Sequence, residues 1–338
     1  MFYLYWAAMR PRIQLPSDWL NQPLSAIATL SPIQELSYPP WRSAGIRVSV
    51  KREDLLHEQL GGNKLYKLWG HLQAARQWAK DKHQDTYVLA SFGGAYSNHL
   101  YALAAAGEQL GLSTIGFVRG ERPARLSPTL HDCLNMGMNL HFLSRTEYAS
   151  KNDMAMLDRL AAEIGIEKRV FWIPEGGGGV LGMTGCRVLA HGMVQQSVVK
   201  PDILAVAVGT GTTLAGLSLG LPASITAFGV SVIKGGESLL PQIHDLVRCY
   251  EHDAPSPVLC CDFHAGGYAR LSSELREFIK HFEQHTQLML DPVYTAKLFW
   301  AITQLARQGA WRPGTHILAL HSGGIQGRRG FDIQGGSD

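Results

Sequence analysis

The stretch "GGNKLYKLWG", residues 61–70, places a lysine where a flexible glycine turn becomes a helix. Apolar residues recur after it at the spacing of one helix face, which predicts a helix with Asn63 as its N-cap. Lys64 would then lie in the first helical turn, where the helix dipole disfavours a cation. A lysine that does not stabilise the helix is a candidate for a reactive amine. The apolar positions are Leu65, Leu68, Trp69, Leu72 and Ala75.

A glycine- and threonine-rich loop in "AVAVGTGTTLAG" follows an apolar strand and precedes a helix of small residues. Glycines expose backbone N–H groups, the helix start is electropositive, and hydroxyls add donors, so this loop is suited to a phosphate. It has neither the lysine of a nucleotide-triphosphate loop nor the spacing of a dinucleotide loop. A glycine-rich turn that binds nothing is the alternative. The candidate residues are Gly209, Thr210, Gly211, Thr212 and Thr213.

A second loop, "GGAYSNH", places Ser97, Asn98 and His99 after Gly93 and Gly94, at another expected helix start. Taken alone, Ser97 or Asn98 would be read as a helix cap. A lysine, a phosphate loop and small polar donors together favour a phosphorylated aldehyde cofactor bound as a Schiff base, which indicates pyridoxal phosphate. Loss of hydration would lower the pKa of the lysine amine from about 10.4 and make it reactive.

The elements that must hold these loops alternate between strand and helix along most of the 338 residues. This alternation predicts an α/β fold of parallel sheets with helices on both faces, whose ligands bind beyond the carboxyl ends of strands. "PEGGGGVLG", residues 174–182, interrupts the pattern and is the best signal for a boundary or hinge.

With these residues in place, the chain resembles the 1-aminocyclopropane-1-carboxylate deaminase and D-cysteine desulfhydrase family of pyridoxal-phosphate-dependent enzymes. The resemblance implies two three-layer α/β domains with mainly parallel twisted sheets, the tryptophan-synthase-β-like (type II) fold. It implies a large cofactor-binding domain, 1–66 plus 175–338, and a small inserted α/β domain, 67–174. The matching segments, in family order, are "VKREDLL", "GGNKLYKL", "GGAYSNH", "WIPEGG", "GTGTTLAG", "FHAGGYARLS", "DPVYTAKL" and "HSGG".

The resemblance also implies roles for the residues. Lys64 would form the Schiff base and act as catalytic base, and Asn98 would bond the cofactor's 3-hydroxyl. The loop from Thr210 through Gly211 and Thr212 to Thr213 would hold its phosphate. Lys67 would be a further phosphate contact; its alternative is a surface cation. Ser322 would face the pyridine nitrogen, and Thr295 is a further expected cofactor contact.

On the substrate side, the resemblance implies that Ser97, Asn98 and His99 bind the carboxylate, with Ser97 also counted as catalytic. Tyr268 and Tyr294 would act at the reacting side as acid, base or positioning groups. Each tyrosine could instead be a core aromatic whose hydroxyl is tethered.

The expected reaction is elimination of the β-substituent of a small amino acid, D-cysteine desulfhydrase-like, giving a keto acid, ammonia and sulfide. Ser322, Thr295 and His99 stand where the family's branches differ, and all three favour the desulfhydrase side over cyclopropane ring opening. The chain departs from the family at Tyr66, at residues 269–272 and at residues 325–330. Rival interpretations are the cyclopropane deaminase, a racemase or β-replacement enzyme, and a non-catalytic pyridoxal-phosphate-binding protein.

Composition bounds the remaining possibilities. The formal net charge of +3 does not suggest a nucleic-acid partner, and the sequence has no membrane-length apolar run. Five scattered cysteines favour reduced thiols and a cytoplasmic location, and "CCDFH" is expected to hold buried thiols rather than a metal. The apolar start, residues 1–12, lacks the basic region of a signal peptide. The expected partners are a small amino-acid substrate and, by family, a second copy in a homodimer.

Overall fold

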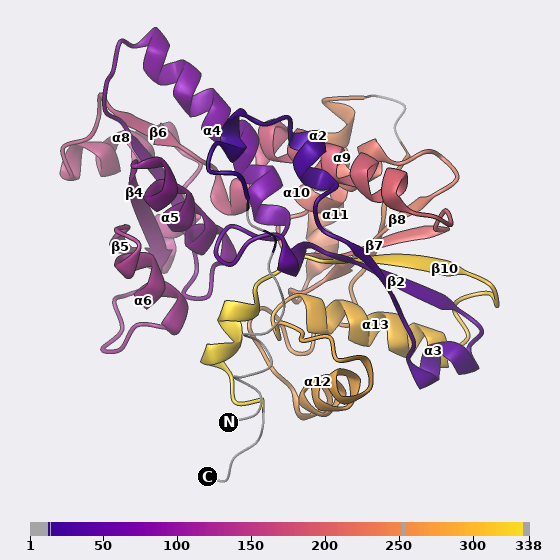
Figure 1. Ribbon diagram of the computed structural model, residues 1–338. Coiled ribbons are helices and arrows are strands. Elements are labelled where there is room, and N and C mark those ends of the chain that lie inside the picture. Colours follow the sequence, from indigo (N-terminus) through magenta and orange to yellow (C-terminus); the bar gives the residue numbers. More distant parts are fainter. Residues whose placement is uncertain (1–12, 14, 252–254, 334–338) are drawn as a thin grey trace.

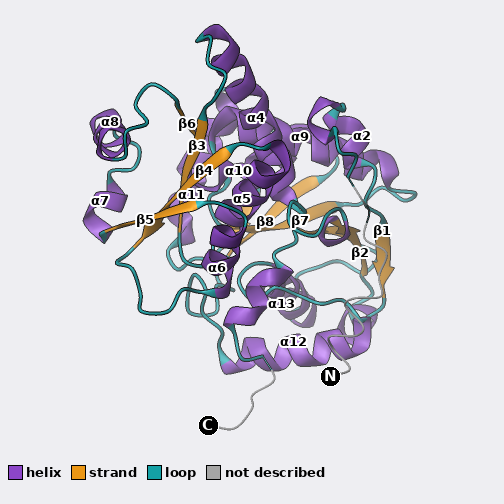
Figure 2. Cartoon of the chain, turned by 60° about the vertical axis from the view of Figure 1, so that its left-hand side comes forward, coloured by secondary structure: helices purple, strands orange, loops and turns teal. Residues whose placement is uncertain are grey.

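The computed structural model describes residues 13, 15–251 and 255–333, and its strands form two sheets (Figures 1 and 2). The apolar start of the chain, residues 1–12, which bears on the signal-peptide expectation, lies outside the described residues. The α/β fold with mainly parallel sheets and helices on both faces is confirmed.

The larger sheet has the strand order β1-β2-β10-β7-β8-β9, and all neighbouring strands are parallel except β1 and β2. It pairs strands from opposite ends of the chain, since Lys51 of β2 lies opposite Leu320 of β10. The segments that follow β2 and β10 therefore both begin at the end of the sheet where these parallel strands finish. The strands are β1 (Ile33–Leu36), β2 (Arg47–Arg52), β7 (Ile203–Val208), β8 (Thr226–Ser231), β9 (Val258–Cys260) and β10 (His316–His321).

The smaller sheet has the order β5-β4-β3-β6 and is parallel throughout. It is built from one continuous stretch of chain between residues 88 and 172, and the division into domains 1–66 plus 175–338 and 67–174 stays a prediction. The strands are β3 (Val88–Gly93), β4 (Ser113–Arg119), β5 (Asn139–Leu143) and β6 (Val170–Trp172).

Helices cover both faces of the two sheets (Figure 1). The α-helices are α2 (Leu24–Ala28), α3 (Pro39–Ser43), α4 (Asn63–Asp81), α5 (Asn98–Leu110), α6 (Pro128–Asn135), α7 (Arg145–Ala149), α8 (Met154–Glu163), α9 (Gly179–Gln196), α10 (Thr212–Gly220), α11 (Leu239–Arg248), α12 (Ser273–Thr286) and α13 (Thr295–Arg307). Short 3₁₀ turns are η1 (Trp19–Asn21), η2 (Glu53–Leu55), η3 (Glu175–Gly177), η4 (Gly236–Ser238) and η5 (Ile325–Gly330).

One buried apolar cluster joins both sheets through helices α4, α5, α9 and α10. The helices approach closely because small residues lie between them: a Cβ added at Gly185 of α9 would stand 1.9 Å from the carbonyl oxygen of Tyr66 in α4. A second cluster packs α3, α12 and α13 on the opposite face of the larger sheet. The site-bearing helix α4 is therefore fixed on one side by backbone contact with α9.

Two local expectations change. The helix α4 begins at Asn63 itself, so Asn63 is not the N-cap; the preceding position is Gly62, with φ of +74°. Cys260 and Cys261 are half-buried rather than buried, and all five cysteines are free. Among the described residues, no helix combines the length and apolar character needed to cross a membrane, and no group of three or more His, Cys, Asp or Glu side chains could hold a metal.

Candidate active site

A cavity of about 970 Å³ lies where the carboxyl ends of strands from both sheets face each other. It brings together every predicted site residue except Thr295. Those residues come from positions as distant in the chain as 64 and 322, and are Lys64, Lys67, Ser97, Asn98, His99, Thr210, Gly211, Thr212, Thr213, Tyr268, Tyr294 and Ser322.

The first turn of α4 is held against the end of β10. Gly62 has φ of +74°, and a Cβ there would lie 2.0 Å from the carbonyl oxygen of Ser322, so no other residue fits without displacing the backbone. Asn63 donates from Nδ2 to Oγ1 of Thr213 at 2.8 Å and accepts from Nζ of Lys64 at 2.9 Å. Asn63 thus links the lysine to the glycine- and threonine-rich loop instead of capping the helix.

Lys64 has the electrostatic character of a reactive amine. Burial in the cavity, followed by the nearby charge of Lys67, lowers the pKa of Lys64 to about 7. Its Nζ stands 5.7 Å from the ring centre of Tyr294. Because the proton is lost near neutral pH, the amine can act as nucleophile and base there, as the sequence predicts.

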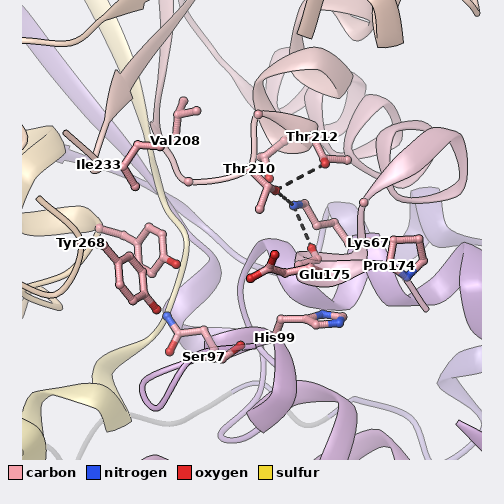
Figure 3. Close-up of a pocket in the computed structure, with 18 of the residues that line it drawn as sticks. Lys67, Ser97, His99, Pro174, Glu175, Val208, Thr210, Thr212, Ile233 and Tyr268 are labelled. Atoms are coloured by element: carbon pink, nitrogen blue, oxygen red, sulfur yellow. Dashed lines mark hydrogen bonds between the residues drawn. The ribbon is translucent and has the colours of Figure 1, made fainter. Parts of the chain in front are cut away.

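The loop after β7 forms an anion cradle at the start of α10. Gly211 adopts a left-handed φ of +82°, and α10 begins at Thr212, so unpaired N–H groups of the first turn face the cavity. Thr210 Oγ1 stands 3.5 Å both from Oγ1 of Thr212 and from Nζ of Lys67 (Figure 3). These donors converge from two helices on one point.

Lys67 shows that the cradle fits a phosphate group. Its side chain is buried, and its Nζ donates to the carbonyl oxygen of Gly176 at 3.0 Å, with no carboxylate partner among the described residues. Burial lowers the pKa of Lys67. A buried cation beside hydroxyls and a helix N-terminus needs an anion, which the phosphate of pyridoxal phosphate would supply. The alternative reading of Lys67 as a surface cation is wrong.

The loop after β3 places Ser97, Asn98 and His99 at the start of α5. Ser97 caps that helix, since its Oγ accepts from the N–H of Leu100 at 3.2 Å. Asn98 Oδ1 accepts from Nε2 of Gln326 at 2.9 Å. His99 is buried, and its Nε2 stands 2.8 Å from Oγ of Ser91. The capping alternative therefore holds for Ser97 while the three residues still line the cavity.

Two tyrosines stand together at one side of the cavity. The rings of Tyr268 and Tyr294 meet edge to face at 6.2 Å between centres, and Tyr268 donates to the carbonyl oxygen of Tyr96 at 3.4 Å. Burial raises the pKa of Tyr268 to about 12 and that of Tyr294 well above 10. Both hydroxyls are therefore protonated at neutral pH and can donate.

Thr295 is the one predicted site residue that the structure does not bring to the cavity. It is fully buried, and its Oγ1 is engaged with Asp291, donating to Oδ2 at 2.9 Å. The Asp291 carboxylate also accepts from the N–H groups of Val293, Tyr294 and Thr295. Thr295 thus completes a carboxylate-capped turn that starts α13 and orients Tyr294, and the expectation that it contacts the cofactor is corrected.

Sequence reasoning missed several residues at the site, and three of them bear directly on the predicted ones. Glu175 lies within the matching segment "WIPEGG" and lines the cavity, so the motif itself could have indicated it. Gln326, which orients Asn98, lies in the segment that departs from the family and has no sequence signal. Asp291, whose carboxylate accepts from the N–H groups of Val293, Tyr294 and Thr295 just before α13, is the first residue of "DPVY" and could have been read as such an acceptor.

The fold and this constellation define a pyridoxal-phosphate enzyme. Residues 27–323 match the family described as pyridoxal-phosphate dependent enzyme, and the chain belongs to that family.

The relatives carry the names of the predicted deaminase and desulfhydrase family. The bifunctional D-cysteine desulfhydrase/1-aminocyclopropane-1-carboxylate deaminase of Arabidopsis thaliana is 31% identical over 313 residues, covering 84% of this chain and 73% of that protein. A Pyrococcus horikoshii protein that carries the provisional name 1-aminocyclopropane-1-carboxylate deaminase is 30% identical, covering 85% and 87%. The crystal structure of a 1-aminocyclopropane-1-carboxylate deaminase homologue superposes with a TM-score of 0.76 at 30% identity, covering 96% and 95%. The family resemblance, the cofactor and the type II fold are thereby confirmed.

Proposed function

We propose that this chain eliminates the β-substituent of a small amino acid in the manner of a D-cysteine desulfhydrase. Cysteine and water would give pyruvate, ammonia and hydrogen sulfide. The observation that carries the proposal is the meeting of Lys64, whose pKa is lowered to about 7, with an anion cradle and two protonated tyrosines in one cavity.

When bound, pyridoxal phosphate would supply an electron sink conjugated to the substrate Cα. Lys67 and the loop Thr210–Thr213 would hold its phosphate, and Asn98 would meet its ring hydroxyl. The Lys64 amine, deprotonated near neutral pH, would take the Cα proton. Tyr268 or Tyr294 would deliver a proton to the departing sulfur, since both hydroxyls stay protonated.

The substrate carboxylate would bind at the start of α5, at the side-chain donors of Ser97 and Asn98 and at the backbone N–H of His99. The first-turn N–H groups there have no carbonyl partner within the helix and favour an anion.

Ser322 supports elimination of a good leaving group over cyclopropane ring opening. It lines the cavity, and its hydroxyl has no hydrogen-bond partner among the described residues. A neutral hydroxyl facing the pyridine nitrogen would leave that nitrogen largely unprotonated, so the ring would be a weaker electron sink. That suits departure of sulfide or chloride.

The proposal extends to the whole molecule. The two domains, 1–66 plus 175–338 and 67–174, would close on the substrate about the glycine run at 176–179, in a cytoplasmic homodimer. Sedimentation of the purified protein at two concentrations would test the dimer, and cell fractionation would test the location.

The deciding experiment is an assay of the purified protein with D-cysteine beside L-cysteine, D-serine and 1-aminocyclopropane-1-carboxylate. We expect a yellow protein that loses its colour on borohydride treatment and lacks it in Lys64→Ala, and release of pyruvate and sulfide from D-cysteine. Turnover of the cyclopropane amino acid alone would favour the deaminase. Interconversion of enantiomers or β-replacement would favour those reactions, and colour without turnover would favour a binding protein.

A further inference from the structure

Glu175 places a carboxylate inside the active-site cavity. It begins η3, the turn directly after β6, and lines the cavity. Figure 3 shows its carboxylate pointing into the cavity between Lys67 and Tyr268. The same turn supplies the Gly176 carbonyl that accepts from Lys67, so the position of Glu175 is tied to the anion cradle.

Two side chains fix the direction of this carboxylate. The hydroxyl of Tyr148, a buried residue of α7, donates to Oε1 of Glu175 at 2.7 Å. Nζ of Lys151 stands 3.4 Å from Oε2. A carboxylate engaged at both oxygens is held in one orientation, and its remaining lone pairs are available to a ligand in the cavity.

The negative charge of Glu175 reaches the reacting side of the site. The pKa values of Tyr268 and Tyr294 are raised first by burial and further by nearby charges, among them that of Glu175. The hydroxyls proposed to meet the substrate's leaving group therefore lie within the field of this carboxylate.

We infer that Glu175 is a specificity-determining residue that sorts substrates by the charge of their β-substituent. It favours a neutral hydrogen-bond donor, such as a thiol or hydroxyl, or a positively charged amine, and it disfavours a carboxylate, sulfonate or phosphate. This inference rests on the proposed function, because it takes the β-substituent to lie toward the two tyrosines. Like charges a few ångströms apart in a partly buried cavity repel strongly, and opposite charges attract.

The cations near Glu175 weaken its preference among charged β-substituents without reversing it. Lys151 offsets part of the Glu175 charge, and since 21% of the Lys151 side chain and 35% of the Glu175 side chain are accessible, water screens both charges. Arg119 and Arg145 also line the cavity, yet both are exposed where β4 and β5 end, so water and salt screen them. We therefore expect the inhibition constant to change about tenfold for each unit of charge on the β-substituent.

The test compares three ligands that differ mainly in the charge of the β-substituent: alanine, 2,3-diaminopropionate and aspartate, each as both enantiomers. Their inhibition constants are measured against elimination from cysteine, with wild type and Glu175→Gln. The amide keeps an acceptor for Tyr148 while removing the charge. Dissociation constants from the absorbance change of the bound cofactor provide the same comparison without turnover.

In Glu175→Gln we expect the aspartate constant to fall about tenfold relative to that of alanine, and the 2,3-diaminopropionate constant to rise about tenfold. Glu163→Gln is the matched control, because this exposed residue of α8 pairs with Arg159 and does not line the cavity. It should leave all three constants unchanged.

Two failures are distinguishable. If the protein turns over cysteine and the ratios of the three inhibition constants are the same in wild type and Glu175→Gln, the role of Glu175 is overturned. Absence of turnover with every neutral amino acid would instead overturn the proposed function, while the spectroscopic constants still report on Glu175.

Discussion

Replacing Lys67 with methionine should have opposite effects on the cofactor-free and the cofactor-bound protein. The side chain is buried, and its only hydrogen-bond partners in the described structure are a carbonyl and a hydroxyl oxygen. Without a bound anion the charge is poorly compensated and costs free energy of folding. With phosphate in the cradle the same charge is paired.

The magnitudes follow from this environment. In the cofactor-free protein, removing the cation should raise the free energy of unfolding by about 1–2 kcal/mol, because the lost hydrogen bond to Gly176 is smaller than the cost of burying the charge. In the bound protein, losing a buried charge-assisted contact should weaken cofactor binding by about 2–4 kcal/mol. The dissociation constant would rise about 30- to 1000-fold.

The assay is urea unfolding of cofactor-free protein, together with a pyridoxal phosphate titration followed by absorbance. Lys80→Met is the control, since Lys80 lies on the same helix α4 and is exposed. It should change either quantity by less than about 1 kcal/mol, the scale of an exposed charge near a helix C-terminus. If Lys67→Met destabilised the cofactor-free protein by as much as it weakened binding, Lys67 would be a packing residue and the phosphate assignment would be refuted.

Three further changes test the site. The pKa of Lys64 in the folded protein is lowered to about 7, so above pH 7 the unfolded chain binds more protons than the folded one. The free energy of unfolding of the cofactor-free protein should therefore rise between pH 7 and 10.5. Urea unfolding at several pH values should show this rise, and a shallower one in Lys64→Met. Gly62→Ala should cost about 2 kcal/mol or more and disturb Lys64, since its Cβ would meet the Ser322 carbonyl; an unchanged urea midpoint would contradict this. Gln326→Leu should weaken cofactor binding by up to about tenfold by freeing the amide of Asn98, with unfolding free energy within about 1 kcal/mol of wild type.

The sequence was sufficient to predict the family and the fold class, and every site residue it predicted except Thr295 lines the cavity, because glycine-rich turns after strands have few structural solutions. It could not predict contacts made by residues of common type in irregular segments. Gln326 reaches Asn98 from 228 positions away, through a 3₁₀ turn that Arg328 anchors to Glu283. Thr295 was expected at the cofactor from its place in the family motif after Tyr294, but the tertiary fold turns its hydroxyl toward the carboxylate of Asp291.

His99 shows the same limit in its chemistry. Ser91 Oγ donates to the carbonyl oxygen of Ile173 at 2.7 Å, so its lone pair is left to accept from His99, and Nε2 carries the ring proton. Burial, followed by the charges of Lys64 and Lys67, holds the pKa of His99 well below 6.5, so the ring is neutral. Its Nδ1 is a buried lone pair with no hydrogen-bond partner among the described residues.

The neutral His99 ring can accept a hydrogen bond but brings no positive charge to the substrate carboxylate. In our proposal the substrate carboxylate therefore depends on the donors of Ser97, Asn98 and the α5 backbone, while His99 is suited to accept from an N–H group. The residue type could be read from the sequence, but its tautomer is set by a serine on the preceding strand.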